Sequence, residues 1–253
     1  MKLTRIFVLP EEFTPEGIKF SKQATKYLTQ VLRLIAGDEI EVFDGVQKYL
    51  VRLVGASGGH IHGSIIQSGL VEKPARFEVV LAFSCVRPGS VDEILRHATE
   101  LGVSRLVPLI TSRTTRRPTE RKERWTSIIS AAAAQSGRSD LPDLADVTTL
   151  ADFIEEARGA ATQLILSMDP KARPLLSLLE ELTPQEVIVL VGPEGGFDPS
   201  EQAEAVAGGF VPVSLGKSTL RTETAAISAV SMAMMWNEWF QHRQTINNES
   251  PNQ

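Results

Sequence analysis

The sequence predicts an α/β protein in two parts, a small strand-rich unit followed by a larger domain built on a mostly parallel sheet. Residues 1–70 contain short strands of alternating polar and apolar residues, separated by tight turns. From residue 77 onward, short and continuously apolar strands alternate with helices. Such strands are covered by helices on both faces, as in a parallel α/β sheet. A length of 253 residues is ample for both cores.

Composition favours a folded protein of the cytoplasm. The chain is 42% hydrophobic and 23% charged, which is ordinary for a globular protein. It contains no apolar run of about 18 residues or more, and its N-terminus lacks the layout of a signal peptide. The single cysteine, Cys85, cannot form an internal disulfide, which fits a reducing compartment. We therefore expect neither a membrane protein nor a secreted one.

The net charge of −5 hides an uneven distribution. Between Arg105 and Arg138, eight basic residues outnumber two acidic ones, a local charge of +6. Between Ser139 and Phe210, fourteen acidic residues outnumber three basic ones, a local charge of −11. The basic stretch can steer a polyanion toward the protein, or it is a solvated surface with an arginine-rich loop. Charge alone leaves both interpretations open.

The first unit is expected to contain one helix and two hairpins. Ser21 can cap the helix, and Gly37-Asp38 ends it. Strands at 39–43 and 49–54 flank the turn Asp44-Gly45, and Ser57-Gly58-Gly59 leads into a strand at 60–66. This pattern suits a small β-barrel. The apolar face of the helix is expected to consist of Ala24, Tyr27, Leu28, Val31, Leu32 and Ile35.

The second part is expected to alternate strand and helix as far as residue 243. Residues 69–76 are the best linker, and we place the boundary between the domains after residue 72. The polar residues 244–253 are expected to be disordered. Strands are predicted at 77–83, 106–110, 164–168, 187–191 and 211–215, and helices at 91–101, about 119–135 and 223–240.

Two glycine-bearing loops are the strongest functional signals. The first, 192–197, has the sequence Gly-Pro-Glu-Gly-Gly-Phe and precedes a helix that Asp198, Pro199 and Glu201 can cap. Glycines let a ligand approach the backbone, whose free amides can bind it. The loop lacks the lysine of a P-loop and the spacing of a dinucleotide motif. A tight turn without further purpose is the alternative interpretation.

The second loop, 215–221, leads into the helix predicted at 223–240, with Thr222 as its cap. Arg221 is a cation at the wrong end of a helix unless an anionic ligand binds there. Glu223 suits the first turn, and capping alone explains it about as well as chemistry does. Both loops follow what we expect to be neighbouring strands of a parallel sheet, so together they predict one ligand crevice.

These loops, together with motifs elsewhere, resemble one family. Segments 190–197 (Leu-Val-Gly-Pro-Glu-Gly-Gly-Phe) and 220–225 (Leu-Arg-Thr-Glu-Thr-Ala) are similar to signature loops of the ribosomal small-subunit RNA uridine-N3 methyltransferases, of the SPOUT or trefoil-knot class. Further matching segments at 5–8, 31–33, 37–38, 98–103 and 135–138 extend the resemblance over nearly the whole chain. It implies a PUA-like β-barrel over 1–72 and a knotted SPOUT α/β domain over 73–243.

The resemblance also implies an activity and a cofactor. The activity would be methylation of a uridine at N3 in 16S ribosomal RNA, with S-adenosylmethionine as the methyl donor. Arg221 would stabilise the uracil anion, and Glu223 or Glu194 would accept the N3 proton. The backbone cradle for the cofactor would consist of Leu190, Gly192, Gly195, Gly196, Leu215, Gly216, Leu220, Arg221, Thr222 and Ala225.

Two further expectations concern partners. The barrel and a group of arginines would grip the RNA through phosphates and shape. A homodimer is implied, to which the helix at 223–240 offers a hydrophobic stripe; core packing is the alternative for that stripe. The four histidines share no metal-ligand spacing, and no metal is expected. The RNA-binding group comprises Arg113, Arg116, Arg117, Arg121 and Arg138; for Arg138, an ion pair with Asp140 or Asp143 is an equal alternative.

Some features depart from the family pattern, and alternatives remain. His97 stands where a lysine is usual, and Ala131 and Ala134 lie where acidic residues are common; these changes bear on RNA contacts or helix packing.

One rival is a SPOUT methyltransferase acting on a ribose 2′-hydroxyl or another base, and another is a non-catalytic RNA-binding module. A phosphatase or ATPase is more distant, since the chain lacks a P-loop lysine. Free RNA and the assembled subunit are both open as substrates.

Overall fold

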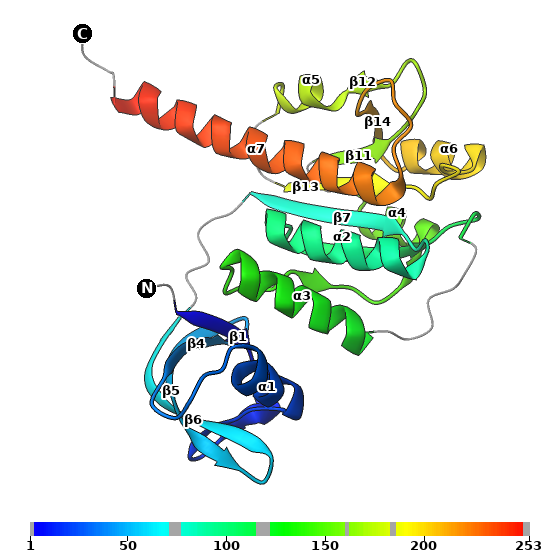
Figure 1. Ribbon diagram of the computed structural model, residues 1–253. Helices are drawn as coiled ribbons and strands as arrows, with labels where there is room; N and C mark the ends of the chain where they lie inside the picture. Colours follow the sequence, from blue (N-terminus) through cyan, green and yellow to red (C-terminus); the bar gives the residue numbers. More distant parts are fainter. Residues whose placement is uncertain (1–2, 71–76, 115–121, 160–161, 183–185, 250–253) are drawn as a thin grey trace. The chain divides into compact units, whose positions relative to one another are not determined.

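The computed structural model describes residues 3–70, 77–114, 122–159, 162–182 and 186–249 (Figure 1). The chain forms two compact units. Unit 1 comprises Met1–Pro74 and Ser130–Leu141, and unit 2 comprises Ala75–Ile129 and Pro142–Gln253. Contacts thus assign 130–141 to unit 1, whereas the sequence pattern places these residues in the second domain.

Unit 1 is a six-stranded mixed sheet in the order β1-β4-β5-β6-β3-β2. β1 and β4 are parallel, and the other neighbours are antiparallel. Both predicted turns are confirmed: Gly45 has a φ of +92°, and Gly58 and Gly59 have φ values of +59° and +80°, which glycine adopts without strain. The strands are β1 (Thr4–Phe7), β2 (Phe13–Thr14), β3 (Gly17–Lys19), β4 (Glu39–Phe43), β5 (Gln47–Ser57) and β6 (His60–Leu70).

The helix of unit 1 is shorter than predicted. α1 (Lys22–Lys26) begins after Ser21, whose hydroxyl accepts a hydrogen bond from the amide of Ala24, and it continues as one π-helical turn over Tyr27–Val31. Arg33 then has a φ of +57°, so the helix ends well before Gly37. The wide turn and this reversal break the 3.6-residue period. The predicted apolar face is therefore wrong for three residues, which are exposed: Tyr27, Val31 and Ile35.

Unit 2 contains an eight-stranded sheet in the order β10-β8-β7-β13-β11-β14-β12, with β9 beside β8. Every recorded pairing in it is parallel, which confirms the predicted fold class. The strands are β7 (Glu78–Ser84), β8 (Arg105–Ile110), β9 (Asp143–Leu144), β10 (Thr148–Thr149), β11 (Gln163–Leu166), β12 (Arg173–Pro174), β13 (Glu186–Val191) and β14 (Val211–Ser214).

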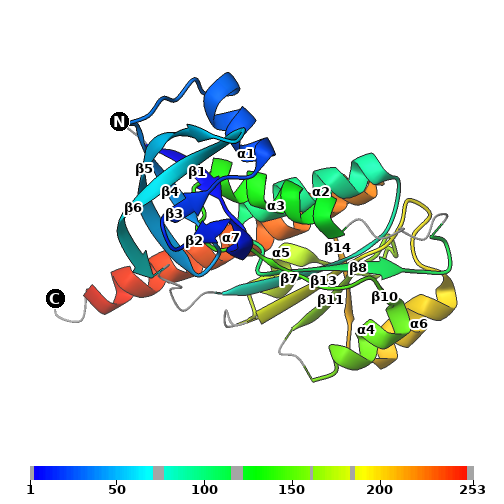
Figure 2. The ribbon, with the colours of Figure 1, turned by 90° about the horizontal axis from the view of Figure 1, so that it is seen from below.

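Helices cover both faces of this sheet (Figure 2). α2 (Pro88–Leu101), α5 (Leu175–Leu179) and α7 (Thr222–Glu249) lie on one face, and α4 (Leu150–Glu156) and α6 (Pro199–Ala207) on the other. α3 (Lys122–Ser136) follows β8 in the chain. Between the sheet and α4 and α6, a core forms around Leu109, Phe153, Ile188 and Phe210. Whether the chain also threads a trefoil knot stays a prediction.

α7 is longer than predicted. It continues to Glu249, so the disorder expected from residue 244 is wrong as far as that residue, and 250–253 lie outside the described residues. The polar composition of 244–249 suggested disorder, but this stretch contains neither glycine nor proline to stop the helix.

Cys85 is buried at the end of β7, and burial raises the pKa of its thiol to about 12. The thiolate is therefore scarce at neutral pH, which fits a cysteine that packs in the core. Across the described ranges, no helix is both long and apolar enough to cross a bilayer.

Candidate active site

The two glycine loops lie at the same edge of the unit 2 sheet. One follows β13 and the other follows β14, and parallel strands all end on one side. β11 lies between β13 and β14, so the expectation of adjacent strands is wrong. The loops nevertheless meet, because the hydroxyl of Thr222 donates a 3.0 Å hydrogen bond to the carbonyl of Gly192. The first loop and the start of α7, 30 residues apart in the sequence, are therefore joined directly by a hydrogen bond.

The first turn of α7 is buried against this edge. Thr222 is 2% exposed and Glu223 is 8% exposed. Thr222 is not the helix cap that the sequence suggests, because its hydroxyl bonds to Gly192 and the helix begins with Thr222 itself. The Oε2 atom of Glu223 is buried without a hydrogen-bond partner among the described residues. A buried carboxylate oxygen left unpaired is unfavourable, so this atom suits a donor or cation on a ligand.

Arg221 precedes this turn and is exposed. Its backbone carbonyl accepts the first hydrogen bond of α7, from the amide of Ala225, at 2.8 Å. Its guanidinium forms no ion pair with any residue that the structure describes. An unpaired cation beside the amino end of a helix provides a strong local attraction for an anionic group.

The first glycine loop leaves its backbone open. Glu194, Gly195 and Gly196 are exposed, and Gly196 has a φ of +70°. A side chain at Gly192 would be crowded, because a Cβ there would lie 3.0 Å from the ring of Phe197 and 3.2 Å from its amide nitrogen. The loop therefore has exposed backbone at Gly195 and Gly196 and a closely packed ring at Gly192.

The other loop also requires a glycine. Gly216 has a φ of +124°, and its amide donates a 3.1 Å hydrogen bond to the hydroxyl of Ser214. A Cβ at Gly216 would meet nothing within 4 Å, so the glycine is needed for conformation rather than for space. Leu215 and Leu220 are half-buried on either side of the loop.

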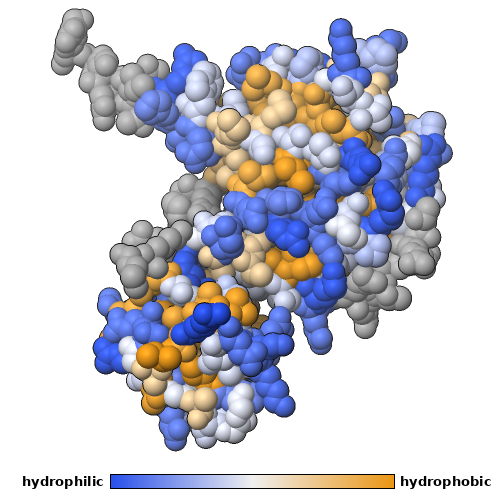
Figure 3. Space-filling view, in the orientation of Figure 1, coloured by the Kyte–Doolittle hydropathy of each residue, from blue (hydrophilic) through white to orange (hydrophobic). Residues whose placement is uncertain are grey.

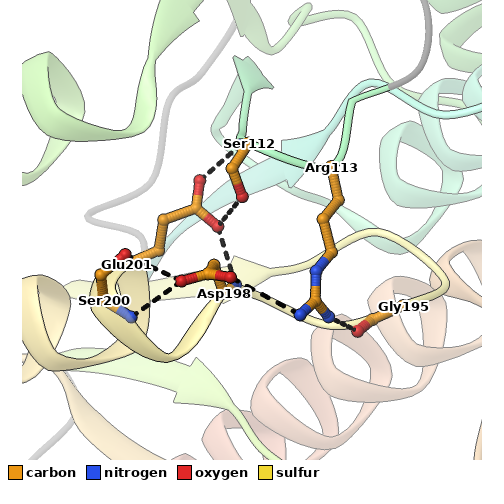
Figure 4. Close-up of polar contacts among 6 residues, drawn as sticks. All are labelled: Ser112, Arg113, Gly195, Asp198, Ser200 and Glu201. Atoms are coloured by element: carbon orange, nitrogen blue, oxygen red, sulfur yellow. Dashed lines mark hydrogen bonds and ion pairs between the residues drawn. The ribbon is translucent and has the colours of Figure 1, made fainter.

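A third segment, Ser112-Arg113, forms hydrogen bonds with the first loop and with the start of α6 (Figure 4). Asp198 and Glu201 form the predicted capping box of α6. Glu201 also accepts bonds from the amide and the hydroxyl of Ser112, and Arg113 donates to the carbonyl of Gly195. Hydrogen bonds from Ser200, and then the charge of Arg113, hold the pKa of Asp198 below its usual value.

The described basic residues of the 105–138 stretch are paired with carboxylates. Arg138, predicted to bind RNA, has a side chain only 8% exposed and lies 2.8 Å from Asp140, which is the alternative held open for it. Arg116, Arg117 and Arg121 lie outside the described residues. The other pairs are Arg105 with Asp143 and Glu156, Arg113 with Asp198, Lys122 with Asp146, and Arg124 with Asp92.

The remaining predicted positions lie in the first loop, on α2 and on α3. Glu194 is exposed, and its carboxylate is 3.8 Å from the guanidinium of Arg87. His97 is on α2, 3.1 Å from Glu100. Ala131 is exposed and Ala134 is half-buried, both on α3. No described group of three or more His, Cys, Asp or Glu residues could hold a metal ion.

Two parts of the site were not predicted from the sequence. The segment after β11 leaves the sheet between the two glycine loops, and its Ser167 hydroxyl accepts a 3.0 Å bond from Gln202 of α6. The other part is the link from Ser112 and Arg113 to the first loop. Polar residues directly after an apolar strand were the available signal in both cases.

The fold and site define a two-part RNA methyltransferase. The RNA methyltransferase domain family matches residues 72–234, and the RNA methyltransferase PUA domain family matches residues 20–66. The chain is 34% identical to the ribosomal RNA small subunit methyltransferase E of a Synechocystis species, over 90% of this chain and 76% of that protein. It belongs to the ribosomal RNA small subunit methyltransferase E family, as its sequence motifs predict.

Solved structures agree with this assignment. A methyltransferase from Legionella pneumophila, solved with the bound cofactor SAM, superposes with a TM-score of 0.82 at 28% identity, covering 93% of this chain and 98% of its own. The ribosomal RNA small subunit methyltransferase E of Neisseria gonorrhoeae, bound to S-adenosyl methionine, gives 0.79 at 25% identity, covering 92% and 98%.

Proposed function

We propose that this chain transfers a methyl group from S-adenosylmethionine to N3 of a uridine in small-subunit (16S) ribosomal RNA. The observation that carries the proposal is the junction of the two glycine loops, made by the Thr222 hydroxyl and the Gly192 carbonyl. The family supports the substrate, and the cofactor bound in the Legionella and Neisseria relatives supports the donor.

The residues at the junction suit this cofactor. Its adenine edge needs amide donors and carbonyl acceptors, and the amide of Gly195 and the carbonyl of Gly196 are exposed and have no hydrogen bond among the described residues. When bound, the cofactor supplies an electrophilic methyl group. The residues proposed to hold it are Leu190, Gly192, Gly195, Gly196, Leu215, Gly216, Leu220, Arg221, Thr222 and Ala225.

The protein must also prepare the uridine. N3 carries a proton and becomes a nucleophile when that proton leaves, so an anion must be stabilised beside the methyl donor. Arg221 is suited to this, because its guanidinium is exposed and has no described ion-pair partner. Glu223 is the preferred proton acceptor, since one of its oxygens is unpartnered, whereas Glu194 already faces Arg87. Positioning by the two loops supplies the remainder of the acceleration.

We also propose that the active form is a homodimer. In unit 2, hydrophobic residues gather over the region of α5 and α7 (Figure 3). Met235 is 72% exposed and Trp239 is 47% exposed on α7, whereas Trp236 packs in the core against Phe77. Two large exposed apolar side chains on one helix favour a protein interface. Sedimentation equilibrium is expected to give twice the 27.7 kDa chain mass, and Met235→Lys is expected to shift it toward the monomer.

The function is tested with labelled cofactor. The chain is incubated with methyl-labelled S-adenosylmethionine and small ribosomal subunits that lack the modification, and the RNA is mapped by primer extension. A methyl at N3 blocks the pairing edge of the uridine, so we expect label in 16S RNA and one strong stop.

Each rival predicts a different result of that experiment. Label at a ribose or on another base would identify a different SPOUT methyltransferase. No transfer to free RNA or to subunits, together with no S-adenosylmethionine binding in calorimetry, would indicate a non-catalytic RNA-binding module.

A further inference from the structure

The peptide group between Gly195 and Gly196 is held at both ends. The carbonyl oxygen of Gly195 accepts a hydrogen bond from the guanidinium of Arg113. The amide of Gly196 donates a 2.8 Å hydrogen bond to the carbonyl of Pro193. With its oxygen and its hydrogen both engaged, this peptide plane can adopt one orientation only, even though two glycines flank it.

Arg113 is itself fixed in place (Figure 4). Its second terminal nitrogen lies 3.6 Å from the carboxylate of Asp198. The preceding residue, Ser112, donates its amide to Glu201 at 2.6 Å and its hydroxyl to the same carboxylate at 3.0 Å. Both α6 capping residues therefore hold the Ser112-Arg113 segment in addition to capping the helix.

Helix capping alone does not require this arrangement. The capping box of α6 is complete with Asp198, Glu201 and the helix amides. The additional bonds join the end of β8 to the first glycine loop, two segments 82 residues apart in the sequence. Their effect is to determine where the exposed backbone of the loop points.

We infer that Arg113 is a positioning residue for the cofactor loop and not an RNA contact, contrary to the sequence expectation. The inference rests on the proposed function, since it takes the loop to be the S-adenosylmethionine cradle. Arg113 donates a hydrogen bond to the Gly195 carbonyl and thereby fixes the peptide between Gly195 and Gly196. The backbone at Gly196 is then oriented toward the ligand. The hydrogen bonds from Ser112 to Glu201 keep Arg113 in position beside the loop.

The test measures cofactor binding without RNA. In isothermal titration of the full chain, Arg113→Ala is expected to weaken S-adenosylmethionine binding about 5- to 20-fold, with Arg113→Lys in between because lysine lacks the planar fork. Arg158→Ala is the matched control, since that arginine makes a similar exposed pair with Glu155 on the far end of α4, and it should leave the affinity unchanged. Circular dichroism checks that each variant is folded. If Arg113→Ala is unstable, Arg113→Gln replaces it in the titration.

RNA binding provides the second readout. Without cofactor, Arg113→Ala should bind ribosomal RNA as the wild type does, with the same salt dependence. A phosphate contact would instead lower RNA affinity and reduce the salt slope by about one. That result would overturn the inference alone. So would an unchanged cofactor affinity in Arg113→Ala when the wild type binds the cofactor well. A wild-type chain that binds no S-adenosylmethionine would overturn the proposed function, and this inference with it.

Discussion

Replacing Arg221 with alanine is expected to lower the rate of methyl transfer about 100- to 1,000-fold while changing S-adenosylmethionine affinity less than about threefold. The guanidinium is exposed at the start of α7 and has no ion pair within the described residues, so it is available to the anion that forms on the uracil. The backbone carbonyl that starts the helix remains in the variant, so the pocket keeps its shape. Single-turnover assays on small subunits and calorimetry with the cofactor measure the two quantities.

Lys217 provides the matched control for this prediction. It is an exposed cation in the same loop, and Lys217→Ala should leave the rate of transfer nearly unchanged. Arg221→Lys should recover part of the loss, because the charge returns without the planar donor fork. Full activity in Arg221→Ala would remove this arginine from the proposed mechanism.

Gly192→Ala is expected to weaken cofactor binding and to lower the melting temperature by several degrees. The new Cβ would lie 3.0 Å from the Phe197 ring and 3.2 Å from its amide nitrogen, so the ring or the loop must shift by a few tenths of an ångström. Overpacking of this kind costs about 1–3 kcal/mol. Displacing Gly192 also disturbs the carbonyl that Thr222 holds. Calorimetry and thermal denaturation give the two measurements.

Gly195→Ala separates this clash from a general effect of side chains in the loop. Its added Cβ would lie 3.5 Å from the nearest atom, an Arg113 carbon, which is an ordinary contact. We expect the melting temperature of this variant to stay close to that of the wild type. An equal fall in melting temperature from both substitutions would show that contact with Phe197 is not the cause of the loss of stability.

The sequence predicts those features that depend on neighbouring residues. The apolar runs became parallel strands, and Asp198 with Glu201 formed the expected capping box, since both follow from short-range patterns. The two hairpin turns are likewise determined by glycines that adopt positive φ. The family motifs located the loops correctly, because each motif is contiguous in the chain.

What the sequence could not give depends on contacts between distant segments. Nothing in the chain order shows that β11 lies between β13 and β14, or that Thr222 bonds to Gly192 rather than capping its helix. The basic stretch could have been a surface for a polyanion, but its described members are paired with acidic residues that lie between 2 and 85 residues away in the sequence. Arg138 with Asp140 and Arg105 with Glu156 are examples, 2 and 51 residues apart.

The bond between Thr222 and Gly192 also sets an order of events during synthesis. A ribosome makes β13 before α7, so the Gly192 carbonyl has no partner until the start of the last helix has emerged and packed on β7 and β13. The proposed donor site is therefore complete only after α7 has packed on the sheet of unit 2. A nascent chain halted before residue 222 should hold a largely formed sheet and yet remain unable to capture the methyl donor.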